Sequence, residues 1–141
     1  MPEHKVSLNA AAITLYRQGI RRACAENYER SIICYQRALD CIENPRASGK
    51  LERCILTSLG DAHWALEAHA VAVEAYEVAL WGMTAGEGHP YLHLRIGQNS
   101  LDTGDAKHAL EHLRAAFDGD ESLFEFEDPR YLQFLESAGC L

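Results

Sequence analysis

The sequence predicts an all-α protein built from repeated pairs of helices, because one spacing of residues occurs three times. In each copy a glycine is followed twelve positions later by a small residue, and a second small residue comes seven positions after that. Seven residues are two turns of an α-helix, so both small residues lie on one helix face. The copies are Gly60, Ala72 and Ala79; Gly19, Ser31 and Ala38; and Gly97, Ala109 and Ala116.

A bulky residue lies between the two small residues of each copy. It is Tyr76 in the middle copy, Tyr35 upstream and Leu113 downstream. Glycine has no Cβ, so a helix that carries it can approach a neighbouring helix closely. We therefore expect each glycine at the contact between the two helices of a pair, with the bulky residue filling the space there.

This pattern resembles the tetratricopeptide repeat (TPR), a helix–turn–helix unit of about 34 residues. The hallmarks in the middle copy are Leu59, Gly60, Ala72, Tyr76 and Ala79. The downstream copy matches nearly as well, whereas the upstream copy has Gln18 and Ser31 where Leu and Ala are usual. The resemblance implies a TPR-type α-solenoid of about three repeats plus a C-terminal capping helix.

Start and stop signals position the individual helices. We expect helices over about residues 7–25, 28–42, 50–66, 69–81, 91–101 and 106–117, and a last one from 129. Residues 1–7 are expected to fray, with Ser7 as the first N-cap. Pro45 stops the second helix, and Pro90 suits the first turn of the fifth. Asp128 and Pro129 open the last helix as N-cap and first residue.

Length and composition predict one globular domain over residues 1–141. The chain is 48% hydrophobic and 24% charged, which is ordinary for a globular protein. Its parts are repeats at about 12–45, 53–86 and 90–118, an acidic loop at 118–128 and a cap helix at 129–138. No apolar run approaches the roughly 20 residues that cross a bilayer, and no signal peptide is recognisable. We expect a cytoplasmic protein with reduced cysteines, no cofactor and no membrane partner.

Charge is distributed unevenly along the chain. Residues 1–60 hold nine Lys and Arg against six Asp and Glu, whereas residues 61–141 hold four against fifteen. An acidic second part disfavours nucleic acid as a ligand and favours a cationic protein. The acidic residues that we expect at a partner surface are Asp120, Glu121, Glu125 and Glu127.

Two histidines have a spacing that is known from metal sites. His108 and His112 belong to an H-x-x-E-H sequence, which in some metallopeptidases holds zinc. They flank the packing positions Ala109 and Leu113, however, and no third ligand is obvious in the sequence. His63 occupies a packing position, where a core role is expected. Since no other catalytic pattern can be recognised, we predict no catalytic residue, no metal site and no enzyme activity.

The TPR resemblance implies a concave groove lined by the first helix of each pair. The positions carried over are Ile13, Tyr16, Ile20, Cys54, Thr57, Asp61, Trp64, Tyr91, Leu94, Gln98 and Leu101. Members of the family that bind a C-terminal carboxylate use Lys and Asn at positions held here by Tyr16, Ile20 and Asp61, so that ligand is not expected. Two alternatives remain at this point. The positions form an apolar groove for a helix or an extended peptide, or several of them pack against the N-terminal segment or the cap.

Residues 55–137 further resemble small bacterial repeat proteins that end in an acidic loop and a helix with a similar sequence. These look like immunity or adaptor proteins encoded beside secreted toxin domains. The resemblance implies a protein that binds and occludes a cognate toxin or effector, whose surface would be cationic. The alternative is a secretion-type TPR chaperone for an exported protein. A third hypothesis, from another class, is a metal-dependent hydrolase that uses His108 and His112.

Overall fold

The computed structural model describes residues 2–42, 49–81 and 89–141, which form helices and turns without a β-strand. The chain divides into two compact units, Met1–Gly82 (unit 1) and Met83–Leu141 (unit 2). The expected all-α class is confirmed for the described residues. The expected stop at Pro45 and the ends of the first two repeats lie outside them. The prediction of a single domain stays a prediction.

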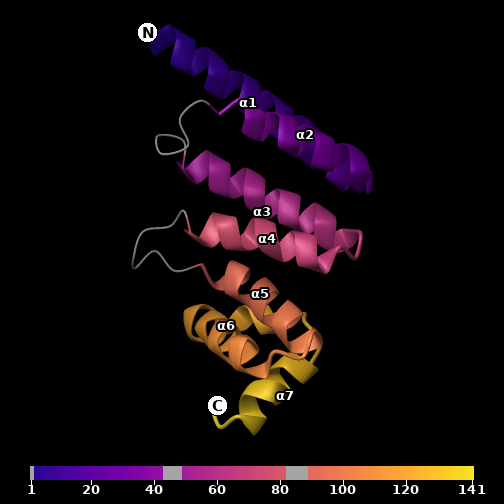
Figure 1. The fold of residues 1–141 in the computed structure, drawn as a ribbon, viewed down its shortest axis with the longest axis vertical. Helices are drawn as coiled ribbons and strands as arrows, with labels where there is room; N and C mark the ends of the chain where they lie inside the picture. Colours follow the sequence, from indigo (N-terminus) through magenta and orange to yellow (C-terminus); the bar gives the residue numbers. More distant parts are fainter. Residues whose placement is uncertain (1, 43–48, 82–88) are drawn as a thin grey trace. The chain divides into compact units, whose positions relative to one another are not determined.

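Unit 1 consists of two antiparallel helix pairs (Figure 1). The helices are α1 (Pro2–Cys24), α2 (Tyr28–Asp40), α3 (Gly49–Ala65) and α4 (His69–Trp81). Helix α1 packs on α2, α2 on α3, and α3 on α4. The N-terminal prediction was wrong, because α1 begins at Pro2 and Ser7 lies inside it. A proline is tolerated in a first helical turn, so nothing in residues 2–7 stops the helix from extending.

Unit 2 contains α5 (Pro90–Asp102), α6 (Ala106–Gly119), the short 3-10 helix η1 (Glu121–Phe124) and α7 (Arg130–Ser137). The expected acidic loop therefore begins within α6 and includes a helical turn. Helix α7 begins at Arg130 rather than at Pro129. Asp128 still caps this end, since its Oδ1 accepts a hydrogen bond from the Arg130 amide at 3.0 Å.

The turn inside each helix pair is built at the same repeat position. Glu26, Glu67 and Gly104 each follow their repeat glycine by seven residues and have φ angles of 59°, 62° and 90°. Residues with a left-handed backbone conformation commonly end helices. The amide of the next residue then donates a hydrogen bond to a carbonyl in the last helical turn. That amide belongs to Asp105 in unit 2, where it donates to the Ser100 carbonyl at 2.8 Å. Asp105 then caps α6 through the His108 amide at 3.1 Å, as the sequence predicted.

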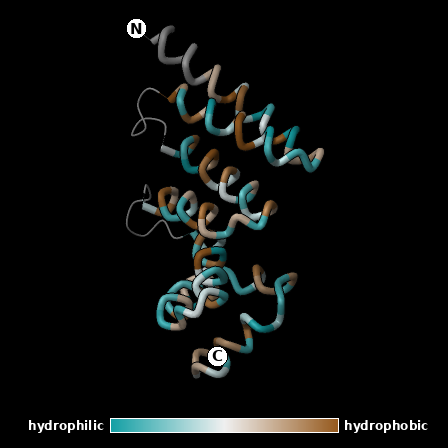
Figure 2. The backbone as a smooth tube through the Cα atoms, turned by 45° about the vertical axis from the view of Figure 1, so that its right-hand side comes forward, coloured by the Kyte–Doolittle hydropathy of each residue, from teal (hydrophilic) through white to brown (hydrophobic). Residues whose placement is uncertain are grey.

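The repeat glycines lie against the bulky residues, which confirms the expected packing. A Cβ atom at Gly60 would lie 2.5 Å from Tyr76 Cε1, and one at Gly97 would lie 2.7 Å from Leu113 Cγ. Gly19 contacts Tyr35 in the same way. Along most of the helices, hydrophobic and hydrophilic residues alternate, as expected for amphipathic helices with one buried face (Figure 2). Helix α4 is an exception, since it is mostly hydrophobic.

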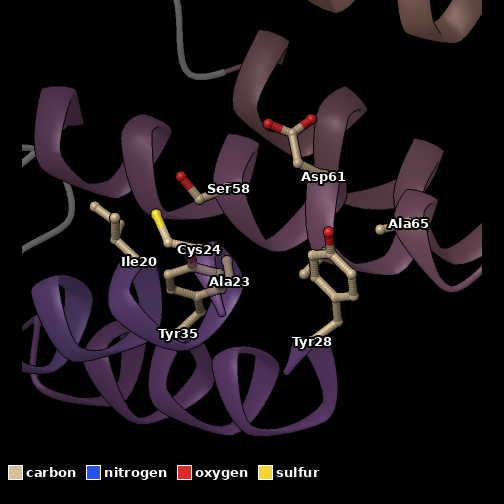
Figure 3. Close-up of a pocket in the computed structure, with 9 residues that line it drawn as sticks. Ile20, Ala23, Cys24, Tyr28, Tyr35, Ser58, Asp61 and Ala65 are labelled. Carbon is tan, nitrogen blue, oxygen red and sulfur yellow. The ribbon is translucent and has the colours of Figure 1, made fainter. Parts of the chain in front are cut away.

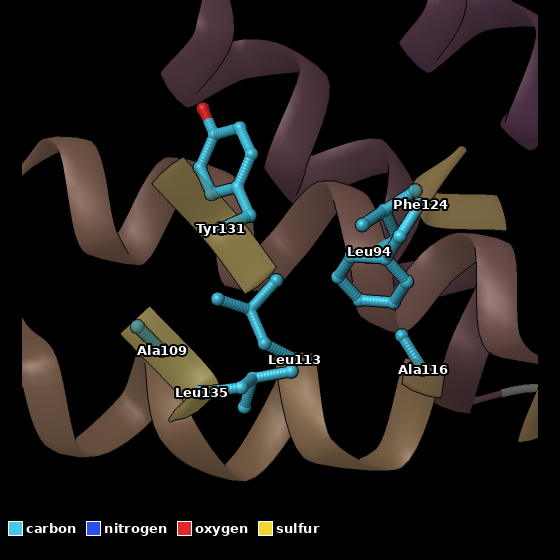
Figure 4. Close-up of a cluster of buried hydrophobic side chains, with 7 residues drawn as sticks. All are labelled: Leu94, Ala109, Leu113, Ala116, Phe124, Tyr131 and Leu135. Carbon is cyan, nitrogen blue, oxygen red and sulfur yellow. The ribbon is translucent and has the colours of Figure 1, made fainter. Parts of the chain in front are cut away.

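The core of unit 2 joins its C-terminal segment to the helix pair. Its buried side chains are Leu94, Ala109, Leu113, Ala116, Phe124, Tyr131 and Leu135. The ring of Phe124 lies beside Leu94, and the hydroxyl of Tyr131 points out of the cluster (Figure 4). That hydroxyl donates to Asp102 Oδ2 at 3.1 Å, and Arg130 forms an ion pair with Asp102 at 2.8 Å. Apolar packing and this polar contact together hold the segment on α5 and α6.

We expect Gly60→Ala to lower the free energy of unfolding by about 1–3 kcal/mol, because the added methyl group overpacks the contact with Tyr76. Elsewhere in a helix the same change stabilises by about 1 kcal/mol, so the sign of the effect tests the packing. Gly49→Ala is the matched control, since among the described residues a Cβ there meets only the flexible end of Arg53, at 3.4 Å. Chemical denaturation measures both, and a Gly60→Ala protein as stable as wild type would contradict the assigned contact.

We expect Leu135→Ala to destabilise the protein by roughly 2–4 kcal/mol, because this side chain is fully buried and its loss leaves a cavity. Phe126→Ala is the control in the same segment, since Phe126 is 94% exposed and its truncation should change stability by less than about 0.5 kcal/mol. Equal thermal unfolding of the two variants would show that α7 does not cap the core.

Candidate functional site

Unit 1 contains an open pocket between α1 and α3, with a volume of about 380 Å³. Side chains of the two helices face each other across it, Ile20 and Cys24 from α1 and Ser58 and Asp61 from α3 (Figure 3). Ala23, Tyr28, Tyr35, Ala62 and Ala65 complete the lining. Two of the residues expected in the groove, Ile20 and Asp61, thus lie at one pocket.

The spacing of α1 and α3 is fixed by a pair of tyrosines. Tyr35 from α2 is 2% exposed, and its ring lies 5.8 Å from that of Tyr16, between centroids. Tyr16 reaches α3 with its hydroxyl, which lies 3.0 Å from Ser58 Oγ. Burial raises the pKa of Tyr35 to about 12, and the nearby Tyr16 and Asp61 add to the shift. The Tyr35 hydroxyl is therefore neutral at physiological pH and contributes an apolar ring to the pocket wall.

Asp61 is held in place from behind by the repeat contact. The Tyr76 hydroxyl donates a hydrogen bond to Asp61 Oδ1 at 2.7 Å. Tyr76 is fully buried, whereas Asp61 is exposed. A carboxylate has two oxygens and several lone pairs, so it can accept this bond and also meet a cation at the pocket rim.

The other expected groove residues of unit 1 do not line this pocket. Thr57 is half-buried and donates its hydroxyl hydrogen bond to the Arg53 carbonyl of its own helix at 2.8 Å. Trp64 is half-buried, with its ring centroid 4.2 Å from that of His69 and 6.4 Å from that of Tyr76. Both belong to the same helix as Asp61, one turn before and one turn after it.

In unit 2 the expected groove residues are engaged with the chain's own C-terminal segment. Leu94 and Gln98 are each 1% exposed, and Leu94 lies in the core with Phe124. Leu101 packs at the edge of the same core. Leu94 and Leu101 correspond to the second alternative left open by the sequence, packing against the cap, whereas Gln98 is buried and accepts a hydrogen bond from Arg95. The hypothesis of an open groove is therefore corrected at Leu94 and Gln98, because both side chains are buried.

Arg95 links the covered face of α5 to the acidic segment. Its Nη1 donates to Gln98 Oε1 at 3.0 Å and forms an ion pair with Glu127 at 3.2 Å, while Nε donates to the Tyr91 hydroxyl at 3.2 Å. The guanidinium also lies over the Tyr91 ring, 5.3 Å from its centroid. Arg95 was not among the residues expected at a site, because its role depends on Glu127, which lies 32 residues further along the chain.

The four expected acidic residues fall into two classes. Glu127 pairs with Arg95, and Asp120 caps η1 by accepting hydrogen bonds from the Ser122 amide at 3.1 Å and hydroxyl at 2.6 Å. Glu121 and Glu125 are exposed. Two of the four therefore have structural contacts, and the other two present their carboxylates at the surface.

The histidines of unit 2 come together in a way that the sequence did not reveal. His112 and His108 lie on one face of α6, with ring centroids 4.4 Å apart. His93 Nδ1 of α5 lies 2.9 Å from His112 Nδ1. Among the described residues, no group of three His, Cys, Asp or Glu side chains could hold a metal ion. No local pattern points to this pairing, since His93 and His112 are 19 residues apart on different helices.

The helix pairs, the capping segment and the pocket define a TPR-type α-solenoid. No protein-family model matches the sequence, and no curated protein matches it. Among solved structures, the first TPR domain of Spaghetti (RPAP3), bound to the HSP90 peptide SRMEEVD, is similar with a TM-score of 0.72. The similarity covers 93% of this chain and 95% of that chain at 16% identity, so it shows the fold alone. In the described part of this chain, no helix is long and apolar enough to cross a membrane.

Proposed function

We propose that this protein is a protein-binding module whose unit 1 pocket receives a segment of a partner. The observation that carries the proposal is the open pocket between α1 and α3, which has apolar walls and one carboxylate at its rim. Ligand sites are concave and largely apolar, with a few polar groups that set specificity. The similar RPAP3 domain binds a peptide, which supports a peptide-like ligand.

The residues of the pocket favour an apolar segment that carries a positive charge. Ile20, Tyr35 and the alanines would contact an apolar side chain, and Asp61 would meet a Lys or Arg beside it. The peptide SRMEEVD bound by the RPAP3 domain has three acidic residues and one basic residue. An acidic peptide of that kind would bring carboxylates to Asp61, so we propose that this chain prefers the opposite charge.

For the biological role we propose a bacterial immunity or adaptor protein that occludes a cognate toxin or effector. Support comes from the resemblance of residues 55–137 to such proteins and from the acidic character of residues 61–141. The pocket would hold the partner, while exposed carboxylates attract its cationic surface. A secretion-type chaperone is the alternative, favoured by the short acidic chain with about three repeats. A neighbouring toxin gene would distinguish the first role from the second.

We expect selection of random displayed peptides on the full chain to enrich peptides that combine a bulky apolar residue with Lys or Arg. A labelled peptide from this set should lose at least about tenfold in affinity on Ile20→Glu, which corresponds to about 1.4 kcal/mol. Ile33→Glu is the matched control, because Ile33 is 55% exposed and does not line the pocket. Enrichment of acidic peptides, or equal binding by both variants, would refute the pocket as the site.

We expect the exposed carboxylates to control how fast a cationic partner is captured. With the protein of an adjacent toxin gene as partner, Glu121→Gln with Glu125→Gln should slow association roughly 3- to 10-fold at low salt, and high salt should remove the difference. Glu29→Gln with Glu74→Gln is the control, since it removes the same charge from exposed positions in unit 1. Equal association rates for the two double variants would show that the acidic segment is not part of the interface.

A further inference from the structure

Three imidazoles lie in direct contact between α5 and α6. His112 is in the centre of this histidine cluster, 5.1 Å from His93 and 4.4 Å from His108, measured between ring centroids. The Nδ1 atoms of His93 and His112 are 2.9 Å apart, which is a hydrogen-bond distance. Both residues are half-buried. The cluster therefore spans the same helix pair that the Gly97–Leu113 contact closes.

The hydrogen bond between His93 and His112 limits how many protons the pair can hold. One Nδ1 must donate and the other must accept, so one imidazole has to keep its Nδ1 unprotonated. A single added proton is compatible with the contact, because a cationic ring can still donate to a neutral one. A second added proton would place two N–H groups against each other and two positive charges side by side. The pair cannot be doubly charged while the contact persists.

The surroundings of the cluster oppose protonation further. Burial lowers the pKa of His112 to about 4, with added effects from His108 and His93. Burial and the nearby His89 lower the pKa of His93. Glu111 on α6 is exposed, as are Glu121 and Glu125 of the C-terminal segment, and two charged groups of that segment have partners away from the cluster. Glu127 pairs with Arg95, and Arg130 pairs with Asp102.

We propose that the histidine cluster is an acid-sensitive contact that holds α5 on α6 at neutral pH and loosens this helix pair in mild acid. In the unfolded chain His93 and His112 each take up a proton near the ordinary histidine pKa of about 6.5, whereas in the folded pair both resist protonation. The unfolded state thus binds more protons between about pH 6.5 and pH 4, and stability falls as the pH falls through this window. Above about pH 6.5 the contact is at full strength.

Thermal unfolding of the full chain tests this proposal. Between about pH 7 and pH 5, we expect the Tm of wild type to fall by on the order of 5–10 °C. His93→Asn and His112→Asn should each remove a large part of this fall, because Asn places a neutral amide atom where Nδ1 lies. The effects of the two substitutions on the fall should be non-additive, since each breaks the same contact. His63→Asn is the control outside the cluster, because burial alone lowers the pKa of His63, so its effect should add to that of His112→Asn.

Additive effects for His93→Asn with His112→Asn, or a fall in Tm that neither changes, would overturn the proposal. If either variant fails to fold, wild type still decides the question by NMR. We expect His112 to titrate far below its ordinary pKa and the amides of α5 and α6 to lose more hydrogen-exchange protection than those of α3 and α4 between the same pH values. Ordinary titration of His93 and His112, or unchanged protection in α5 and α6, would equally overturn it.

Discussion

The close contact between a repeat glycine and a bulky side chain on the paired helix determines how each hairpin is built. The ring of Tyr76 fills the space beside Gly60, so a Cβ atom at this position would lie too close to the ring. Packed interiors tolerate little change in volume, so this contact fixes both the distance and the register of α3 and α4. Tyr76 also contributes to the surface, because its hydroxyl donates the hydrogen bond that positions Asp61 at the pocket rim. Core and candidate site are therefore parts of one arrangement.

Comparison of the repeats shows how the helix face that lines the unit 1 pocket differs from the equivalent face of α5. The residue after the repeat glycine is Asp61 in the middle copy and Gln98 downstream. Tyr76 supplies a hydroxyl to Asp61, whereas Leu113, at the equivalent position, has none. Gln98 is instead bonded by Arg95, which also binds Glu127 and so fastens the C-terminal segment over α5. A change of one buried side chain thus accompanies a change from an accessible to a covered helix face.

Much of the fold could be predicted from the sequence because repeat spacing and cap residues are local signals. The helices, the Gly60–Tyr76 contact and the Asp105 cap all follow from residues less than 20 positions apart. The left-handed turns at Glu26 and Glu67 carry no glycine, so only the repeat position could indicate them. The burial of Leu94 depends on where Phe124 packs, and that segment has no periodic pattern. For the same reason the sequence could suggest Ile20 and Asp61 for a groove but could not show that Gln98 is covered.

Charge separates the two units as clearly as packing does. Residues 1–82 hold nine basic and ten acidic residues, whereas residues 83–141 hold four and eleven. The apolar pocket therefore belongs to unit 1, which is nearly neutral, and most of the net negative charge belongs to unit 2, whose helix face is covered. Long-range attraction acts before contact and short-range packing acts after it, so the two units would contribute to different steps of binding. Loosening α5 and α6 in acid would then act on the unit for which we propose the long-range attraction, whereas the Tyr16–Tyr35 and Tyr76–Asp61 contacts at the pocket involve no histidine.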